Sequence, residues 1–528
     1  MEQGPKQGPG NRPNRRQFLG MMGMAGSALA ASPLLAACGG TSGSTAGEGG
    51  SAASTAPLKV GMVGDVNTFS PFELTRTNYV FTANIYDTLL RYNSSLKPTP
   101  RLADKWSVGQ GNTSITLTLR PGLTFQSGSP VDAEAVVKNF QYAAQETTGD
   151  NLYSFAQYVR SATAVSSSEV RLDFKQPLPT QAITDIVTLT SIIDPAAMSK
   201  LEKKGVGAGP FAFDSWVPNT SLDLSKFSKY WQRSLPELTS IDWTMFSDEV
   251  AMVRALQSGS LDVATYISFQ DASSLKNSYD LVVSPHAPQV YEIRVNPTHA
   301  PFTSQSVRQG LQYAIDRKGI VNSVLWGYSQ PTVLPFGTTS PAYDASAAAE
   351  YPFDLTKAKQ MFAAGGAADW SAEIMVTNDY PETVTMAELL AADLKKIGVN
   401  LKVDVEDITT YDTRLTAGDF TLCGSFAGVG NEYPLWMTLS SDYRVVDNPL
   451  WGGKVPASYS SAMTSVANAV TASQEKAAFA ALRDSLLTES WVIDIAYYPS
   501  ITAVAKGVAG VGYTVNDWLT LESAQRTA

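Results

Sequence analysis

Two histidines and two cysteines are the residues of this chain best suited to nucleophilic or metal chemistry. His286 and His299 lie too far apart in sequence for the i, i+4 pair of a zinc-binding helix. The chain contains no G-x-S-x-G elbow and no P-loop, and the glycine-rich residues 205–210 fit neither P-loop nor dinucleotide spacing. We therefore predict a binding protein without cofactor or metal. Carboxylate pairs leave no sequence signature, so an enzyme remains an alternative.

The two cysteines occur in different contexts. Cys423 follows the apolar run Phe420-Thr421-Leu422, which predicts a buried thiol acting as a small hydrophobe rather than a nucleophile. Cys38 ends the segment Leu35-Ala36-Ala37-Cys38, which looks like a bacterial lipobox. Small residues before the cysteine let a signal peptidase approach the backbone, and the Cys38 thiol then receives diacylglycerol. We predict lipid attachment at Cys38.

The N-terminal segment has the order of an export signal. Arg12, Arg15 and Arg16 form a positive region, and an uncharged, weakly hydrophobic stretch covers residues 18–35. Residues 14–19, NRRQFL, closely match the twin-arginine pattern. We predict a signal peptide over residues 1–37 and a flexible Gly/Ser/Thr/Ala tether over 38–57. The protein would be anchored by lipid outside the cytoplasm, in a periplasm or on the outer face of the plasma membrane.

Composition narrows the possible partners. The chain has 528 residues, of which 44% are hydrophobic and 17% charged, with a formal net charge of −10. This length predicts about three domain-sized units. The acidic balance argues against nucleic acid, because binding phosphates needs clustered Lys and Arg.

Alternating and helical patterns follow one another along the chain and predict an α/β protein. Residues 114–119 alternate as a half-buried strand, and Ser129 is the expected cap of the helix that follows. One long helix is expected over 304–325 and another over 381–397, the second ended by Gly398. The strand pattern at 401–405 then indicates a βαβ-like unit.

Seven ordered blocks of the sequence resemble the extracellular solute-binding protein family 5, which includes oligopeptide-, dipeptide- and nickel-binding proteins of ABC importers. The most specific block, LRPGLTFQSGSPVDAE at 119–134, departs from the family pattern at the next residue, where Ala135 replaces an Asp. The others are residues 100–103 (PRLA) with Trp106, 207–211, 229–231 (KYW), 258–262, 307–317 (VRQGLQYAIDR) and 395–399.

The resemblance implies a two-lobed fold of the large periplasmic-binding-protein type (type II), with an extra domain. The ligand would lie in a cleft between lobes joined by hinge strands, and closure would require contacts with both lobes. The expected ranges are 58–90, 205–295 and 496–528 for lobe I, 91–204 for its extra domain, and 296–495 for lobe II.

The resemblance also suggests ligand-binding residues. Asn67 and Phe69 follow the first strand, Tyr266 follows the block at 258–262, and Asn296 follows a strand at the expected crossover. Peptide-binding members hold the ligand's amino group with an Asp near a Trp. Here that stretch contains Phe426, Glu432 and Trp436 but no Asp, so Glu432 would supply the negative charge.

The most favoured function is therefore a monomeric solute-binding lipoprotein that delivers a small ligand, preferably a peptide, to an ABC permease. An oligosaccharide, an amine or a metal chelate remain alternative ligands, although two histidines make nickel a weaker candidate. A surface sensor or adhesin with the same fold is a further alternative.

Overall fold

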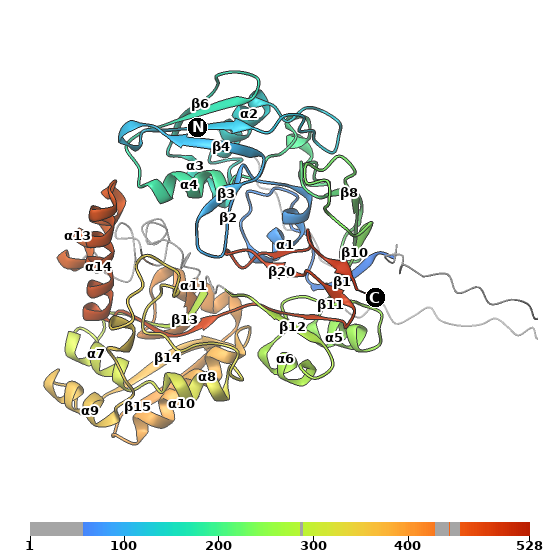
Figure 1. Ribbon diagram of the computed structural model, residues 1–528. Coiled ribbons are helices and arrows are strands. Elements are labelled where there is room, and N and C mark those ends of the chain that lie inside the picture. The colour runs from blue at the N-terminus through green and yellow to red at the C-terminus, as the bar shows by residue number, and fades with distance from the viewer. Residues whose placement is uncertain (1–55, 286–288, 428–442, 444–454, 528) are drawn as a thin grey trace, which may run out of the picture. The chain divides into compact units, whose positions relative to one another are not determined.

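The computed structural model describes residues 56–285, 289–427, 443 and 455–527 (Figure 1). The chain from residue 53 onward forms one compact unit. Its largest sheet, here the first sheet, has seven strands. In spatial order these are β12 (Asp280–Val283), β18 (Ile501–Val504), β11 (Val263–Ala264), β1 (Leu58–Val63), β10 (Ser240–Phe246), β9 (Ser221–Lys226) and β8 (Phe211–Val217). Strand β1 is central and runs parallel to both β10 and β11.

The second sheet has five strands. Their order is β15 (Asn400–Glu406), β14 (Ser371–Thr377), β16 (Leu422–Ala427), β13 (Gln289–Val295) and β17 (Val492–Tyr498). Strands β14 and β15 are parallel and are joined by α10 (Pro381–Lys395), which confirms the predicted βαβ unit. Gly398 has φ +90°, a left-handed conformation that glycine adopts without strain, and it separates α10 from β15.

Two chain segments cross between the sheets. One leads from β12 to β13 and the other from β17 to β18 through Pro499 and Ser500. The Ser284 amide donates a hydrogen bond to the Ser500 carbonyl at 2.8 Å, so the two segments lie side by side. Strand β13 pairs with β16 and β17 along its length, which places residues 289–295 in the second sheet. The expected lobe boundary at residue 296 follows the last residue of β13, and the division into lobes stays a prediction.

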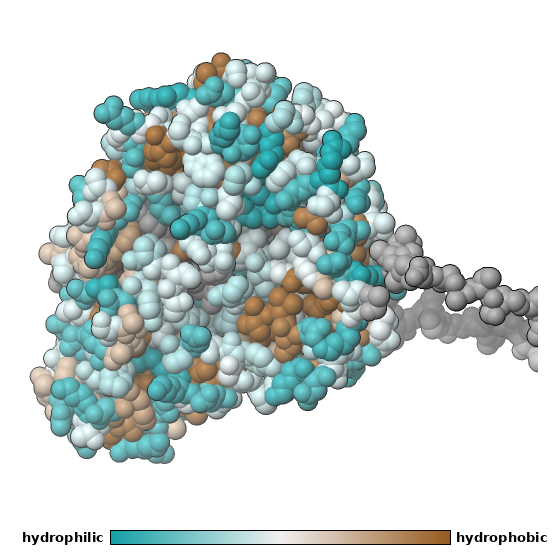
Figure 2. Space-filling model, in the orientation of Figure 1, coloured by the Kyte–Doolittle hydropathy of each residue, from teal (hydrophilic) through white to brown (hydrophobic). Residues whose placement is uncertain are grey.

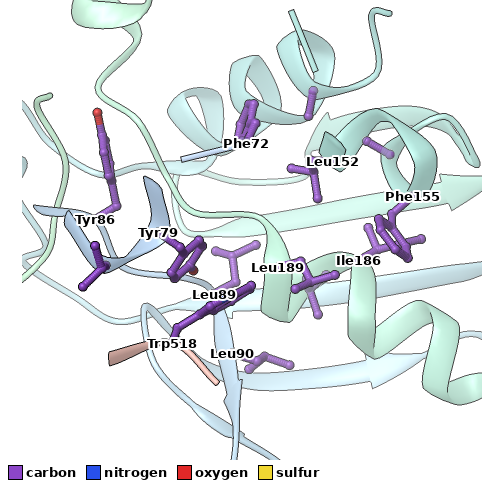
Figure 3. Packing of buried hydrophobic residues seen from close by; sticks show 14 of the residues in the cluster. Phe72, Tyr79, Tyr86, Leu89, Leu90, Leu152, Phe155, Ile186, Leu189 and Trp518 are labelled. Atoms are coloured by element: carbon purple, nitrogen blue, oxygen red, sulfur yellow. The ribbon is translucent and has the colours of Figure 1, made fainter. Parts of the chain in front are cut away.

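A four-stranded sheet lies within residues 91–204, in the order β4 (Ala103–Val108), β5 (Ser114–Leu119), β7 (Glu169–Phe174) and β6 (Val159–Ala164). Its core is continuous with that of the first sheet. Figure 3 shows part of this core, in which Tyr79 and Trp518 approach Leu89. The Tyr79 and Trp518 rings stack with centroids 3.4 Å apart, so the C-terminal segment helps to close the core.

The remaining regular elements cover or connect these sheets. The helices are α1 (Arg76–Ile85), α2 (Ala133–Ala143), α3 (Tyr153–Ala156), α4 (Thr180–Leu189), α5 (Glu249–Gln257), α6 (Phe269–Leu275), α7 (Gln305–Tyr313), α8 (Arg317–Ser323), α9 (Leu355–Ala364), α11 (Ile408–Ala417), α13 (Ala457–Asn468) and α14 (Ala472–Glu489). Short strand pairs are β2 (Leu90–Tyr92) with β3 (Pro98–Pro100), β19 (Val508–Ala509) with β22 (Gln525–Arg526), and β20 (Gly512–Tyr513) with β21 (Leu519–Thr520).

Two helix predictions need correction. The expected helix over 304–325 is divided into α7 and α8, because the Asp316 side chain accepts from the Gly319 amide and caps a new helix. The helix expected to be capped by Ser129 instead begins after Asp132, whose carboxylate accepts from the Ala135 amide. In both cases an aspartate side chain caps the helix at the observed start.

The surface is mixed in character. Figure 2 shows hydrophilic and hydrophobic residues interspersed over most of the visible face, with one compact hydrophobic patch to the right of and below its centre. Within the described residues, no helix is both long and apolar enough to cross a lipid bilayer.

Candidate ligand-binding site

The carboxyl ends of parallel strands are the places where open α/β sheets present ligand-binding loops. In the first sheet, β1 and β11 are parallel, so the loops after Val63 and Ala264 emerge at one edge. In the second sheet, β14 and β16 are parallel, which brings their carboxyl ends, at Thr377 and Ala427, to one edge. The crossing segments connect the two sheets, so these loops are the natural place to look for a site.

An aromatic cluster lies at these strand ends. The Phe426 ring, at the end of β16, lies 4.7 Å from Tyr380 and 5.8 Å from Tyr498 between centroids. Tyr498 also stacks on Tyr291 at 4.8 Å. It lies 6.0 Å from Phe269, the first residue of α6. Phe269 follows β11 of the first sheet, whereas the other four rings come from the second, so the aromatic cluster contains rings from both.

The aromatic cluster offers ring faces and phenol groups. Phe426, Tyr380 and Tyr498 are half-buried, and Tyr291 and Phe269 are buried. Burial raises the pKa of Tyr380, and the nearby Asp412 and Asp379 carboxylates raise it further, so its hydroxyl stays protonated at neutral pH. Such a surface can stack on a ring or an apolar side chain and can hydrogen-bond to a neutral polar group.

A cavity of about 290 Å³ lies beside the crossing segments. Its wall contains both segments and a loop that runs along the free edge of β17, where the Tyr497 amide donates to the Gln330 carbonyl. The lining side chains carry hydroxyl and amide groups but no formal charge. They belong to Val283, Ser284, Pro285, Tyr328, Gln330, Gly337, Thr338, Thr339, Tyr497 and Pro499.

Of the residues predicted from the sequence, Phe426 belongs to the aromatic cluster, and Tyr266 lies in the loop that leads to Phe269. Tyr266 is half-buried with a left-handed φ of 51°, and its ring lies 6.2 Å from Tyr513. Asn67 is exposed in the loop after β1. These three residues therefore lie at or just after the strand ends described above, and their contact with a ligand stays a prediction.

Two other predicted residues have structural contacts instead. Phe69 is fully buried and packs edge-on against Phe213 and Trp216. Asn296 is buried, donates to the Gly418 carbonyl at 2.9 Å and accepts from the Thr298 amide at 3.0 Å, as in a turn. Glu432 and Trp436 lie outside the described residues.

Tyr380, Tyr498, Tyr291 and Phe269 were not predicted from the sequence. Tyr380 follows a strand and precedes Pro381, so the rule for strand ends could have identified it. The other three contact each other across elements far apart in sequence, and no local pattern indicates such contacts.

The structure places some of the residues that could carry nucleophilic or metal chemistry. Cys423 is buried as predicted, and burial raises the pKa of its thiol to about 12, which keeps it protonated. His299 is exposed, whereas His286 lies outside the described part of the chain. Within that part, no group of three His, Cys, Asp or Glu side chains is arranged to hold a metal ion.

Several known proteins are similar to this chain in sequence. Residues 97–442 match the model of the bacterial extracellular solute-binding proteins, family 5. The glutathione-binding protein GsiB of Salmonella paratyphi A is 29% identical over 360 residues, which cover 66% of this chain and 69% of that protein. GsiB of Escherichia coli K12 is 28% identical with the same coverage.

Solved structures share the fold. The ABC transporter substrate-binding protein CtaP of Listeria monocytogenes superposes with a TM-score of 0.81 at 18% identity, covering 90% of this chain and 99% of CtaP. NikA of Brucella suis, in complex with Fe(III)-EDTA, superposes with a TM-score of 0.80 at 20% identity, covering 89% of this chain and 100% of NikA. The dipeptide-binding protein of Pseudoalteromonas sp. SM9913, in complex with Met-Leu, superposes with a TM-score of 0.73 at 18% identity, covering 89% of this chain and 100% of that protein.

The family match covers more than half of the chain, and the fold superposes on those of the solved structures. The chain belongs to family 5 of the bacterial extracellular solute-binding proteins.

Proposed function

We propose that this protein captures a short peptide outside the cytoplasm by hinge closure and delivers it to an ABC permease while anchored to the membrane through lipid on Cys38. The observation that carries the binding proposal is the aromatic cluster at the carboxyl ends of both sheets, where Phe269 and Tyr498 meet beside the crossing segments. A ligand that contacts both sheets stabilises the closed state by its differential affinity.

The peptide class is favoured over the other ligands by two considerations. The relatives are named for glutathione, a short peptide, and one solved neighbour carries Met-Leu. Half-buried rings such as Phe426 and Tyr380 suit apolar or aromatic peptide side chains. An oligosaccharide could stack on the same rings, so it is the second candidate.

The proposal is tested by thermal unfolding of residues 53–528 against a panel of di- and tripeptides including glutathione, oligosaccharides, amines and metal chelates. The protein is first unfolded and refolded to remove bound ligand. A ligand at about a hundred times its Kd stabilises the folded state by about 2.7 kcal/mol and raises Tm. A shift with peptides alone supports the proposal, whereas a shift with sugars alone refutes the peptide class. Release of a product from any panel compound would point to an enzyme.

Removing the Tyr498 ring should weaken ligand binding strongly. Tyr498 contacts Tyr291 and Phe426 of the second sheet and Phe269, which follows the first sheet. A Tyr498→Ala substitution therefore removes the ring that joins the two parts of the aromatic cluster. We expect the Kd of the ligand found in the panel to rise about 10- to 100-fold, as for a buried aromatic anchor. Isothermal titration measures this change.

The matched control is Tyr153→Ala, which removes a half-buried tyrosine from α3. Its Kd should equal that of the unaltered protein. Tyr498→Phe separates the ring from its hydroxyl and should retain most of the affinity. Equal affinities of Tyr498→Ala and Tyr153→Ala would remove Tyr498 from the site.

Replacing Cys38 by serine should release the protein from the membrane. Serine cannot form the thioether to diacylglycerol, and stable anchoring requires at least two acyl chains. In detergent phase separation of cells that make the full chain, the unaltered protein should enter the detergent phase and Cys38→Ser the aqueous phase. Cys423→Ser changes the second cysteine of the chain and should remain in the detergent phase. Retention of Cys38→Ser there would exclude the lipid anchor.

A further inference from the structure

A hydrogen bond joins the four-stranded sheet to the α13–α14 hairpin, far from the crossing segments. The Asn112 side-chain amide donates to the Val470 carbonyl at 3.2 Å and to the Thr180 hydroxyl at 3.2 Å. Asn112 lies in the turn between β4 and β5, and Val470 in the turn between α13 and α14. In Figure 1 the end of this hairpin approaches the four-stranded sheet. Ala469 beside it is only 2% exposed.

Both turns are held in place by their own hydrogen bonds. Asn112 has a left-handed φ of 54°, and its carbonyl accepts from the Leu178 amide at 3.1 Å. On the other side, Thr471 and Gln474 form a capping box at the start of α14. The Gln474 side chain also accepts from the Val470 amide at 3.2 Å. The donor and the acceptor are therefore both positioned before they meet.

The two partners belong to different bodies of the fold. On the side of the four-stranded sheet, Arg101, just before β4, binds Asp87 after α1 and Glu522 of the C-terminal segment. On the other side, Arg308 of α7 donates to the Glu489 carbonyl at 2.6 Å, which fixes α14 to the helices of the second sheet. Any rotation about the crossing segments that separates these bodies must break the bond between Asn112 and Val470.

We propose that the Asn112–Val470 contact is a latch that holds the two sheets closed from the side opposite to the crossing segments. The latch acts without ligand, so it sets the proportion of closed protein that a ligand meets. It rests on the proposed hinge function, but it concerns the empty protein. A net hydrogen bond of ordinary strength corresponds to a roughly fivefold change in the ratio of open to closed molecules.

Asn112→Gly tests the latch with little change to the backbone, since glycine accepts a positive φ more readily than asparagine. Asn219→Gly is the matched control: Asn219 also has a left-handed φ, 55°, and lies exposed in the β8–β9 turn. Dyes on Ser166→Cys and Lys359→Cys, both exposed, report the separation of the four-stranded sheet and α9. Cys423 is the only native cysteine in residues 53–528, and its burial protects it from the dyes.

Single-molecule energy transfer on ligand-free protein gives the fraction of time spent open. We expect a roughly fivefold higher open-to-closed ratio for Asn112→Gly and no change for Asn219→Gly. Asn112→Asp keeps the side-chain size but faces the Val470 carbonyl with a carboxylate, so it should open the protein at least as far. Equal ratios in all variants, or a single static distance in all of them, would overturn the latch.

This result is independent of the ligand. If no compound of the panel binds but Asn112→Gly opens the protein, the latch stands and the proposed function fails. If a compound of the panel binds but Asn112→Gly and Asn219→Gly have the same open-to-closed ratio, the proposed function stands and the latch fails.

Discussion

Replacing Arg101 by methionine is expected to lower the free energy of unfolding by about 3–5 kcal/mol, because it breaks a buried ion network. Arg101 Nε donates to Asp87 Oδ1 at 2.9 Å, and its Nη1 lies 3.0 Å from Glu522 Oε1. The Tyr230 hydroxyl receives a third bond from Arg101 Nη2 at 2.7 Å. The Asp87 side chain has no exposed surface, so loss of the guanidinium leaves two buried carboxylates with too little compensating charge.

Urea unfolding at pH 7, followed by tryptophan fluorescence, measures this loss. Lys105→Met is the matched control, since Lys105 is an exposed cation on the neighbouring strand β4 and should change the free energy by less than about 0.5 kcal/mol. Adding Glu522→Gln to Arg101→Met removes one of the two buried carboxylates that have lost Arg101 as a partner. The double variant should therefore recover part of the lost free energy of unfolding. Equal stability of the two single variants would show that the network contributes nothing.

The same network predicts a loss of stability in acid. Burial alone would raise the pKa of the Glu522 carboxyl, but the charges of Arg101 and Arg91 outweigh it and lower the pKa to about 2. A carboxyl with a lowered pKa stabilises the folded state above its ordinary pKa of about 4.5. That contribution is lost as the pH falls from about 4.5 to about 2. The pH dependence over this window should be smaller in Glu522→Gln than in the unaltered protein.

Replacing Arg317, the first residue of α8, by methionine is also expected to lower the free energy of unfolding by about 3–5 kcal/mol. Arg317 Nε donates to the carbonyls of Thr332 and Asp494 at 3.0 and 2.7 Å, and Nη1 to the Gln312 carbonyl at 2.9 Å. These acceptors lie in three separate segments, so one guanidinium connects α7, β17 and the loop beside it. Without it, several buried carbonyls lose their donor.

Urea unfolding again provides the measurement, with Lys318→Met as the control. Lys318 is the next residue of α8 but is exposed, so Lys318→Met should hardly change the free energy of unfolding. Arg317→Lys should recover only part of the loss, because a single ammonium cannot reproduce the planar fork of donors. Burial lowers the pKa of Arg317 to about 10, which still leaves it charged at pH 7. An Arg317→Met protein as stable as Lys318→Met would contradict this role.

These two networks explain why the family could be identified from the sequence. Arg101 belongs to the PRLA block and Tyr230 to the KYW block, and the two blocks meet in one network. Arg317 ends the AIDR block. The residues that carry the resemblance therefore hold the scaffold together, which is why they identify the fold and not the ligand.

Local patterns in the sequence determined the α/β class, the helix and second strand of the βαβ unit over 381–405 and the burial of Cys423, because alternation, capping and glycine stops act within a few residues. The family resemblance suggested Phe426 as a ligand-binding residue, but it also suggested Phe69, which is a core residue. Only the tertiary structure decided that Phe269 meets Tyr498 and that Asn112 meets Val470. Such contacts join residues hundreds of positions apart, and their pairing depends on how whole sheets pack rather than on any local preference of the chain.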